Sequence, residues 1–145
     1  MTAYLLDTNV VSLLSPSRAG TAAGLMSWLD KANEATEFFL SVVTVHEIER
    51  GIMLLERKGA TGKASDLRRW MDGLFSTYED RILPIDAAVS ALSGKLEAEA
   101  IAAGHSPGMA DALIAGTAKA HDLTVVTLNL RHFEPFGVDL MAAPV

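Results

Sequence analysis

The chain of 145 residues is long enough for one domain with a full hydrophobic core, and its composition, half hydrophobic and 21% charged, excludes intrinsic disorder. The net charge of −6 argues against general nucleic-acid binding, and the absence of cysteine excludes disulfides, thiolate metal sites and cysteine nucleophiles. No signal peptide is visible and no apolar run approaches the ~20 residues of a membrane span, so we expect a cytoplasmic protein without a membrane partner.

Short apolar segments alternate with segments of helical periodicity along the chain. Strands are expected at residues 3–7, 37–41, 81–86, 123–129 and 138–142, and helices at residues 9–15, 21–34, 44–59, 63–79, 87–104 and 107–122. Asp86 is the expected cap of the fifth helix, and Ser106 followed by Pro107 marks the start of the sixth. The alternation predicts an α/β fold with a mainly parallel sheet in one domain of residues 1–145.

One segment of this acidic chain is basic. From Arg50 to Arg69 there are six basic side chains and two acidic ones. Such a segment is compatible with phosphate contact, for example through Arg68 and Arg69. It is equally compatible with a solvated pair of helices, and both interpretations stay open at this point.

Three acids lie next to apolar elements, where a solvated acid is out of place. Asp7 follows the first strand, Glu47 lies in the first turns of the helix after the second strand, and Asp111 lies near the start of the last helix. Asp7 by itself has the residue type of a helix N-cap, but it also lies where open α/β sheets place ligands. Since sheet topology gathers such positions on one edge, we expect the three acids to share a site.

Carboxylates gathered in this way require a proton or a cation. Two bare carboxylates ~4 Å apart repel by about 4 kcal/mol at an effective dielectric of 20. Oxygen ligands without cysteine favour Mg²⁺ or Mn²⁺ over zinc, and water bound to such an ion is a ready nucleophile. The sequence therefore predicts a metal site built from Asp7, Glu47 and Asp111.

Four motifs in order, YLLDTN, SVVTVHE, ADALIA and VVTLNLRHF, make the chain resemble the PIN-domain ribonucleases. The branch that it resembles is that of the VapC and FitB-like toxins of bacterial toxin–antitoxin pairs. The resemblance spans residues 3–140 and implies an α/β/α sandwich, a metal-dependent endoribonuclease, a cognate antitoxin and a homodimer. Asp7, Glu47 and Asp111 match the three main acidic positions of the family. The implied products carry a 5′-phosphate and a 3′-hydroxyl.

The chain departs from the family pattern at Asn129, where relatives often carry a fourth acid. Asn129 offers a carbonyl oxygen to the metal or to a water on it, but no charge, which puts a second metal in doubt. Thr127, at the end of the same strand, either orients a ligand or is a plain strand-end hydroxyl. Arg50, Arg18, Arg131 and His132 are the candidate RNA contacts, and Arg50 is preferred because it is three residues after Glu47 on the same helix.

Two other classes of protein remain open. An acidic α/β phosphohydrolase of the haloacid dehalogenase kind needs a second aspartate two residues after the first, where this chain has Asn9. A non-catalytic PIN-like binding protein, acting with an antitoxin on DNA, is compatible with the missing fourth acid. A nuclease assay with a magnesium titration separates the three hypotheses.

Overall fold

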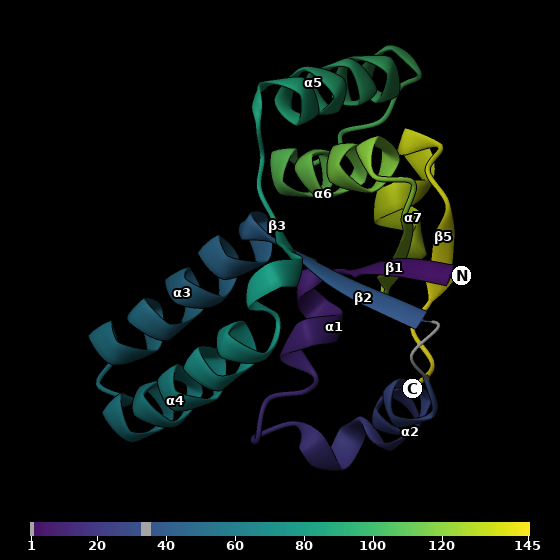
Figure 1. The fold of residues 1–145 in the computed structure, drawn as a ribbon. Coiled ribbons are helices and arrows are strands. Elements are labelled where there is room, and N and C mark those ends of the chain that lie inside the picture. The colour runs from purple at the N-terminus through teal and green to yellow at the C-terminus, as the bar shows by residue number, and fades with distance from the viewer. Residues whose placement is uncertain (1, 33–35) are drawn as a thin grey trace.

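The computed structural model describes residues 2–32 and 36–145. Within them, five strands form one all-parallel sheet in the order β3-β2-β1-β4-β5 (Figure 1). The strands are β1 (Thr2–Leu6), β2 (Thr36–Ser41), β3 (Ile82–Leu83), β4 (Thr124–Thr127) and β5 (Leu140–Ala142). The helices are α1 (Thr8–Ser12), α2 (Ala23–Lys31), α3 (Val42–Arg57), α4 (Thr61–Thr77), α5 (Ala87–Ala102), α6 (Met109–Ala120) and α7 (Leu130–Phe133).

Helices cover both faces of the sheet, which confirms the expected α/β/α sandwich. Successive strand residues point to opposite faces, so Leu5 packs with α5 and α6 while Leu6 packs with α1 and α2. Val125 and Val126 divide between the two faces in the same way. Burial on both faces explains why β1 and β4 have nearly continuous apolar sequences rather than alternating ones.

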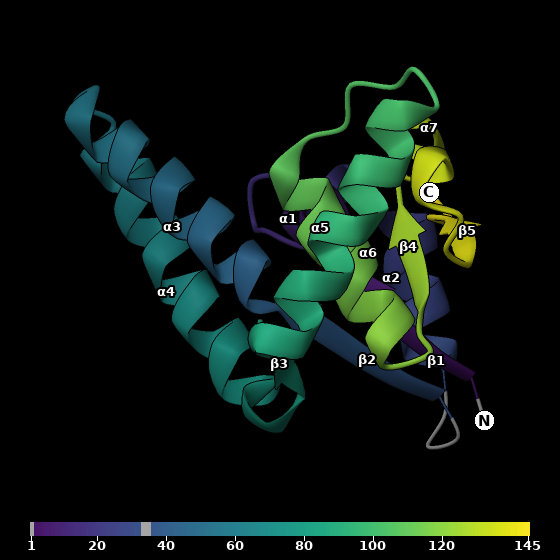
Figure 2. The same cartoon turned by 90° about the horizontal axis from the view of Figure 1, so that it is seen from above.

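Helices α3 and α4 form a hairpin that projects from the β2–β3 side of the sheet (Figure 2). Gly59 at the tip has a φ of +87°, a left-handed conformation that glycine adopts without steric cost. Near the sheet, Ile48, Ile52 and Met71 of the hairpin join the core beneath α1 and α2. The hairpin is thus anchored at its base, and its outer end extends beyond the sandwich.

The sixth long helix begins later than the sequence predicts. Ser106 and Pro107 are not helical, and α6 begins at Met109 with Gly108 as its N-cap at φ −81° and ψ 150°. The φ that proline fixes suits an extended chain as well as a first helical turn, so the Ser-Pro signal was wrong here. The shift places Asp111 in the first turn of α6.

Two smaller differences from the predicted elements lie in the C-terminal part of the chain. The short helix α7 was not expected, and β5 begins at Leu140, two residues later than predicted. Residues 33 and 34 of the predicted second helix lie outside the described part of the chain. Asp86 caps α5 as expected, since its Oδ1 accepts from the backbone N–H of Val89 at 2.8 Å.

The strand order reverses next to β1, which has β2 on one side and β4 on the other. The carboxyl ends of β1 and β4 open there into a crevice of the kind in which open α/β sheets bind ligands. In the described part of the chain, no helix combines the length and the apolar character that a membrane crossing needs.

Candidate active site

Asp7 is both a helix cap and a buried acid at the crevice, so the two interpretations of its position are compatible. Its Oδ1 accepts from the backbone N–H of Thr8 at 2.8 Å and caps α1. Its Oδ2 accepts from the hydroxyl of Thr127 at the end of β4, also at 2.8 Å. The residue is only 5% exposed. The two bonds fix the carboxylate between the ends of β1 and β4.

The environment of Asp7 disfavours its charge. Burial raises its pKa from 3.8 to about 6, against the lowering effect of the bonds from Thr127 and Thr8. The negative charges of Asp111 and Glu47 raise this pKa further. The ionised form of Asp7 is therefore disfavoured by burial and by the nearby negative charges.

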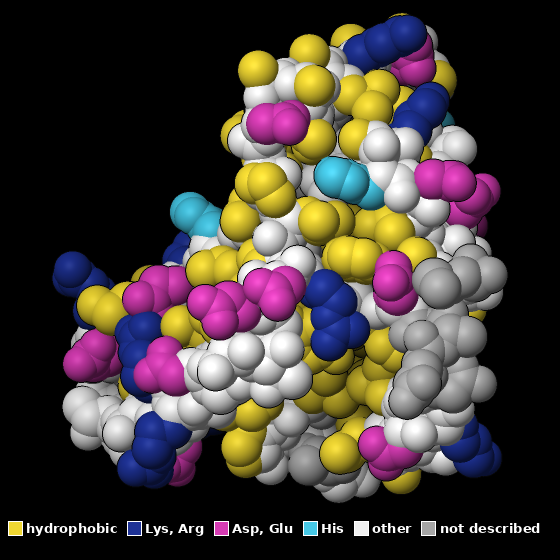
Figure 3. Space-filling model, viewed as in Figure 1, with side chains coloured by type: hydrophobic (Ala, Val, Ile, Leu, Met, Phe, Trp, Pro, Cys, Tyr) yellow, Lys and Arg dark blue, Asp and Glu magenta, His cyan; other side chains and the backbone are white. Residues whose placement is uncertain are grey.

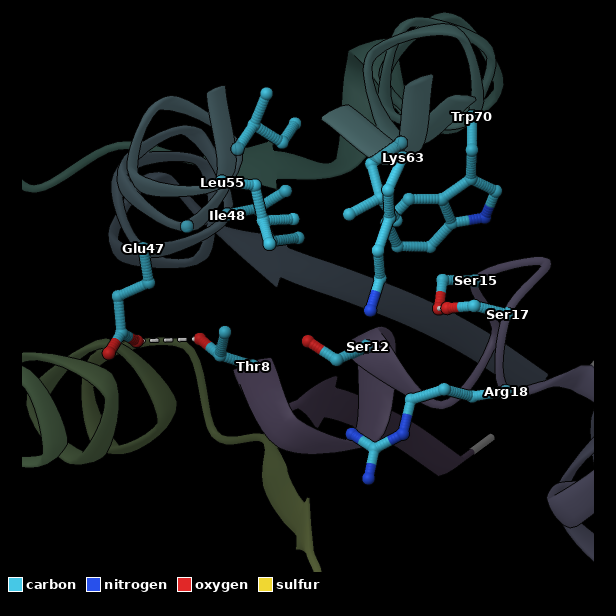
Figure 4. Close-up of a pocket in the computed structure, with 13 residues that line it drawn as sticks. Thr8, Ser12, Ser15, Ser17, Arg18, Glu47, Ile48, Leu55, Lys63 and Trp70 are labelled. Carbon is cyan, nitrogen blue, oxygen red and sulfur yellow. Dashed lines mark hydrogen bonds between the residues drawn. The ribbon is translucent and has the colours of Figure 1, made fainter. Parts of the chain in front are cut away.

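Glu47 is positioned by a chain of hydroxyl groups. Ser41 caps α3 by accepting from the backbone N–H of Val43 at 3.0 Å, which sets the helix on the end of β2. Glu47 lies in the second turn, and its Oε1 accepts from the hydroxyl of Thr8 at 2.7 Å (Figure 4). The same Thr8 hydroxyl lies 2.9 Å from that of Thr44. Thr8 thus links the cap of α1 to the acid of α3.

Asp111 lies in the first turn of α6, where the helix dipole favours a negative charge. Its Oδ2 is 3.6 Å from Nδ1 of His132, an ion pair only when the histidine is protonated. Partial burial raises the pKa of Asp111, the nearby His132 lowers it, and the charge of Glu47 raises it. Asp111 is therefore electrostatically coupled to Glu47 and Asp7.

Asp7, Glu47 and Asp111 lie close enough for their charges to influence one another, but they do not form a closed set of ligands. Within residues 2–32 and 36–145, no three acidic or histidine side chains are close enough to share one ion. Each carboxylate is turned instead toward a neighbour: Thr127 for Asp7, Thr8 for Glu47 and His132 for Asp111. Mutual repulsion accounts for this arrangement, because like charges separate when hydroxyl donors are within reach.

The donor set suits a divalent cation. In the described part of the chain, no lysine or arginine forms an ion pair with Asp7, Glu47 or Asp111. Carboxylate and hydroxyl oxygens are the ligands of hard cations such as Mg²⁺ and Mn²⁺. The pKa of Asp7 is raised chiefly by burial and further by the charges of Asp111 and Glu47, and a bound cation would favour the ionised form of this carboxyl.

The hydroxyl of Thr127 is fully buried and orients Asp7, so it is more than a strand-end hydroxyl. It also accepts from the backbone N–H of Asn129 at 3.0 Å. Asn129 itself is exposed at the N-cap of α7, and its side chain makes no capping bond. The sequence interpretation overlooked Thr8 and Thr44, although Thr44 lies three residues before Glu47, the spacing of helix neighbours.

Two of the cavities that adjoin the acids are lined by candidate RNA contacts. One of about 390 Å³ lies beside Asp111 and is lined by the candidate contacts Arg131 and His132, together with His105. The other, of about 250 Å³, adjoins Glu47 and is lined by Arg18 (Figure 4). Arg50, the preferred RNA contact, is exposed on α3 and lines neither cavity.

Two of the six basic side chains of the basic segment are paired with acids. Arg68 forms an ion pair with Glu49 across the α3–α4 hairpin, and Arg69 forms one with Asp66. Figure 3 shows acidic and basic side chains interspersed over this hairpin rather than a uniform basic face. Arg68 and Arg69 thus already have acidic partners, which weakens their suitability for phosphate.

Comparison with known proteins gives similarity along nearly the whole chain. The family model described as PIN domain matches residues 4–135. Toxin FitB of Neisseria gonorrhoeae is 34% identical over 94% of this chain and 93% of its own length. The VapC ribonuclease Y4jK of Sinorhizobium fredii is 32% identical over 94% of each chain. The crystal structure of FitAcB from Neisseria gonorrhoeae matches with a TM-score of 0.79 and 32% identity, covering 97% of both chains.

Proposed function

Because the chain belongs to the PIN-domain family, in its branch of FitB- and VapC-like proteins, we propose that it is a metal-dependent endoribonuclease and the toxin of a toxin–antitoxin pair. The observation that carries the proposal is the group of three coupled acids at the β1–β4 crevice, which has no lysine or arginine partner in the described residues. The name of the VapC relative, a ribonuclease, supports RNA as the substrate. Residues 1–145 form a single PIN domain in this proposal.

In the proposed reaction, Asp7, Glu47 and Asp111 hold Mg²⁺ or Mn²⁺, which when bound supplies positive charge at the scissile phosphate and acidifies water. Thr127 and Thr8 hold the carboxylates of Asp7 and Glu47 in place by the hydrogen bonds described above. With a pKa of about 6, Asp7 is mostly ionised at neutral pH and ready to act as a ligand. Asn129 is a further ligand, through water, in this proposal.

The test is cleavage of single-stranded RNA by the purified chain with added Mg²⁺. Asp7→Asn should abolish cleavage, although asparagine caps a helix about as well as aspartate. The matched control is Asp86→Asn, because Asp86 also caps a helix through its Oδ1, which accepts from the N–H of Val89 at 2.8 Å, but lies at α5. We expect this control to cleave like the parent. Cleavage that persists undiminished in excess chelator would rule out the proposed mechanism.

A toxin that cleaves cellular RNA requires neutralisation, so we also propose a cognate antitoxin as partner and a homodimer as the assembled form. The name of the FitB relative, a toxin, supports this assignment. The same assay tests the alternative of a non-catalytic protein that acts with an antitoxin on DNA. That alternative requires that the parent never cleaves RNA at any magnesium concentration.

The phosphohydrolase alternative is weaker in the structure than in the sequence. Asn9, which stands where that class needs its second aspartate, lies with its Oδ1 at 3.5 Å from the backbone N–H of Leu128. Its amide therefore faces the loop that follows β4. RNA cleavage with Mg²⁺, combined with no release of phosphate from phosphomonoesters, would exclude this class.

A further inference from the structure

A cavity of about 250 Å³ lies between α1, the loop that follows it, and the α3–α4 hairpin, directly beside Glu47 (Figure 4). No part of the site described above explains it. Apolar, hydroxyl and cationic groups line it together. Among them are Ile48, Ile52, Trp70, Ser12, Arg18 and Lys63.

The apolar groups present an aromatic plane. Trp70 of α4 is half-buried and packs against the core, with the aliphatic Ile48 and Ile52 of α3 behind it. In Figure 4 its indole lies between α4 and the loop that carries Ser15 and Ser17. A half-buried indole at the rim of a small cavity is suited to stacking on a flat ring, and every nucleobase offers such a ring.

Cations that are available for phosphate line the same cavity. Lys63 extends from α4 toward Ser12 of α1, and Arg18 lies on the loop after α1 (Figure 4). Within residues 2–32 and 36–145, neither Lys63 nor Arg18 forms an ion pair, whereas Arg68 and Arg69 do. Of the six cations in the basic segment, Lys63 is the one that lines this cavity. Lys63 is therefore the one residue of the basic segment that is placed to contact a phosphate in this cavity.

We propose that this cavity is a nucleotide subsite for single-stranded RNA, with the base stacked on Trp70 and the flanking phosphates held by Lys63 and Arg18. The proposal rests on the proposed endoribonuclease function and extends it, since the strand then passes from the cavity over Glu47 to the acids. A paired base is stacked within its own helix, so the subsite accepts unpaired nucleotides. Two unpaired cations beside an aromatic plane favour a nucleotide over an apolar peptide segment.

The first test reads Trp70 directly and needs no cleavage. The chain has two tryptophans. Trp28 packs against Tyr4 and Phe38 and does not line this cavity, so Trp28→Phe leaves Trp70 as the single reporter. The probe is a single-stranded RNA of about ten nucleotides, within the length that such sites cover, in chelator. We expect it to quench Trp70, and a perfect RNA duplex not to do so.

The second test measures affinity for the same probe as a function of salt. Lys63→Gln and Arg18→Gln should each lower the slope of log affinity against log salt by about 0.7, the value for one lost contact to single-stranded phosphate. Trp70→Leu should weaken binding about tenfold, with little change in slope, because it removes stacking but not charge. The matched control is Lys58→Gln, an exposed lysine of the same basic segment that does not line the cavity.

The outcomes separate the subsite from the proposed activity. Magnesium-dependent cleavage by the parent, with unquenched Trp70 and unchanged affinity in Lys63→Gln, would overturn the subsite and leave the endoribonuclease in place. If Lys58→Gln lowered the slope of log affinity against log salt equally, the effect would reflect overall charge, and the subsite would be overturned too. Quenching of Trp70 by a bound antitoxin, but not by RNA, would assign the cavity to a protein. If the parent and all variants are equally well folded and the RNA probe does not bind to the protein at all, the proposed subsite is wrong.

Discussion

At the scale of single residues, Asp7 shows how one side chain combines a structural and a chemical task. Its Oδ1 caps α1 while its Oδ2 is held by Thr127, so both carboxylate oxygens are occupied at 5% exposure. Burial among acids raises its pKa to about 6. The cap by itself would tolerate asparagine, and the charge matters only for the ligand role.

We predict that Asp7→Asn changes how stability depends on pH when a chelator is present. Because the folded-state pKa of Asp7 lies above its unfolded value, its protonated form stabilises the fold below about pH 4, and this contribution is lost as pH rises through 6. A shift from 3.8 to about 6 corresponds to about 3 kcal/mol. Urea unfolding between pH 4 and 7 should show the parent losing stability relative to the variant. A constant difference across this range would contradict the raised pKa.

Asn129 gives a second residue-scale prediction. Asn129→Asp should strengthen binding of a second divalent cation, because it adds a carboxylate where the resemblance places a fourth acid. Calorimetric titration with Mn²⁺ measures stoichiometry and affinity, with Asn129→Ser as a control that adds no charge. Unchanged binding in Asn129→Asp would remove this exposed position from the metal site.

At the scale of elements, α5 and α6 cross at a point of very close approach. A Cβ added at Gly116 of α6 would lie 1.9 Å from Oγ of Ser93 and 3.0 Å from its Cα. The missing side chain lets the two helices pack tightly over the sheet, and α6 in turn carries Asp111 into the crevice. Glycine is therefore required at position 116 by the close packing of the two helices and not by a backbone conformation that only glycine adopts.

We expect Gly116→Ala to lower the free energy of unfolding by about 1–3 kcal/mol, the range for overpacked cores. The matched control is Gly94→Ala on α5, where nothing lies within 4 Å of the added Cβ. Since glycine inside a helix costs about 0.5–1 kcal/mol relative to alanine, this control should become more stable. Urea denaturation of both variants measures this difference. Equal gains in the free energy of unfolding would mean that α5 and α6 are loosely packed where they cross.

Ser93 belongs to the same crossing. Its Oγ is buried, and within the described residues it has no hydrogen-bond partner. Loss of an unsatisfied buried hydroxyl is neutral or favourable, so Ser93→Ala should leave stability unchanged or raise it by about 1 kcal/mol. Urea unfolding measures this, and a clear loss of stability would indicate that the hydroxyl has a partner in solution.

At the scale of the whole molecule, an acidic chain concentrates three coupled carboxylates at one crevice of the sheet. We predict that Mg²⁺ stabilises the parent by about 2.7 kcal/mol at a hundredfold excess over its dissociation constant, by mass action. Asp7→Asn should gain much less, and Asp86→Asn should gain as much as the parent. Melting curves with and without Mg²⁺ test this. Equal gains for the parent and Asp7→Asn would exclude Asp7 from the ion's ligands.

The sequence by itself determined the elements and their order, because helical and strand periodicity is local. Short apolar runs predicted β1 and β4, and apolar residues at helical spacing predicted the long helices. The Asp86 cap was predicted from its residue type alone. The sequence also predicts that Asp7, Glu47 and Asp111 share a site at one edge, since parallel strands end on the same side of a sheet. The start of α6 was not, because a Ser-Pro pair fits both a helix start and an extended chain.

Only the tertiary structure decided what surrounds each acid. Asp7 and Thr127 are 120 positions apart, and Thr8 and Glu47 are 39 apart, so no local pattern reveals that these hydroxyls hold these carboxylates. The same holds for the cations, since charge counting cannot distinguish the paired Arg68 from the unpaired Lys63 beside the cavity. Side-chain pairing depends on distances of a few ångström between distant segments, and the fold alone sets those distances.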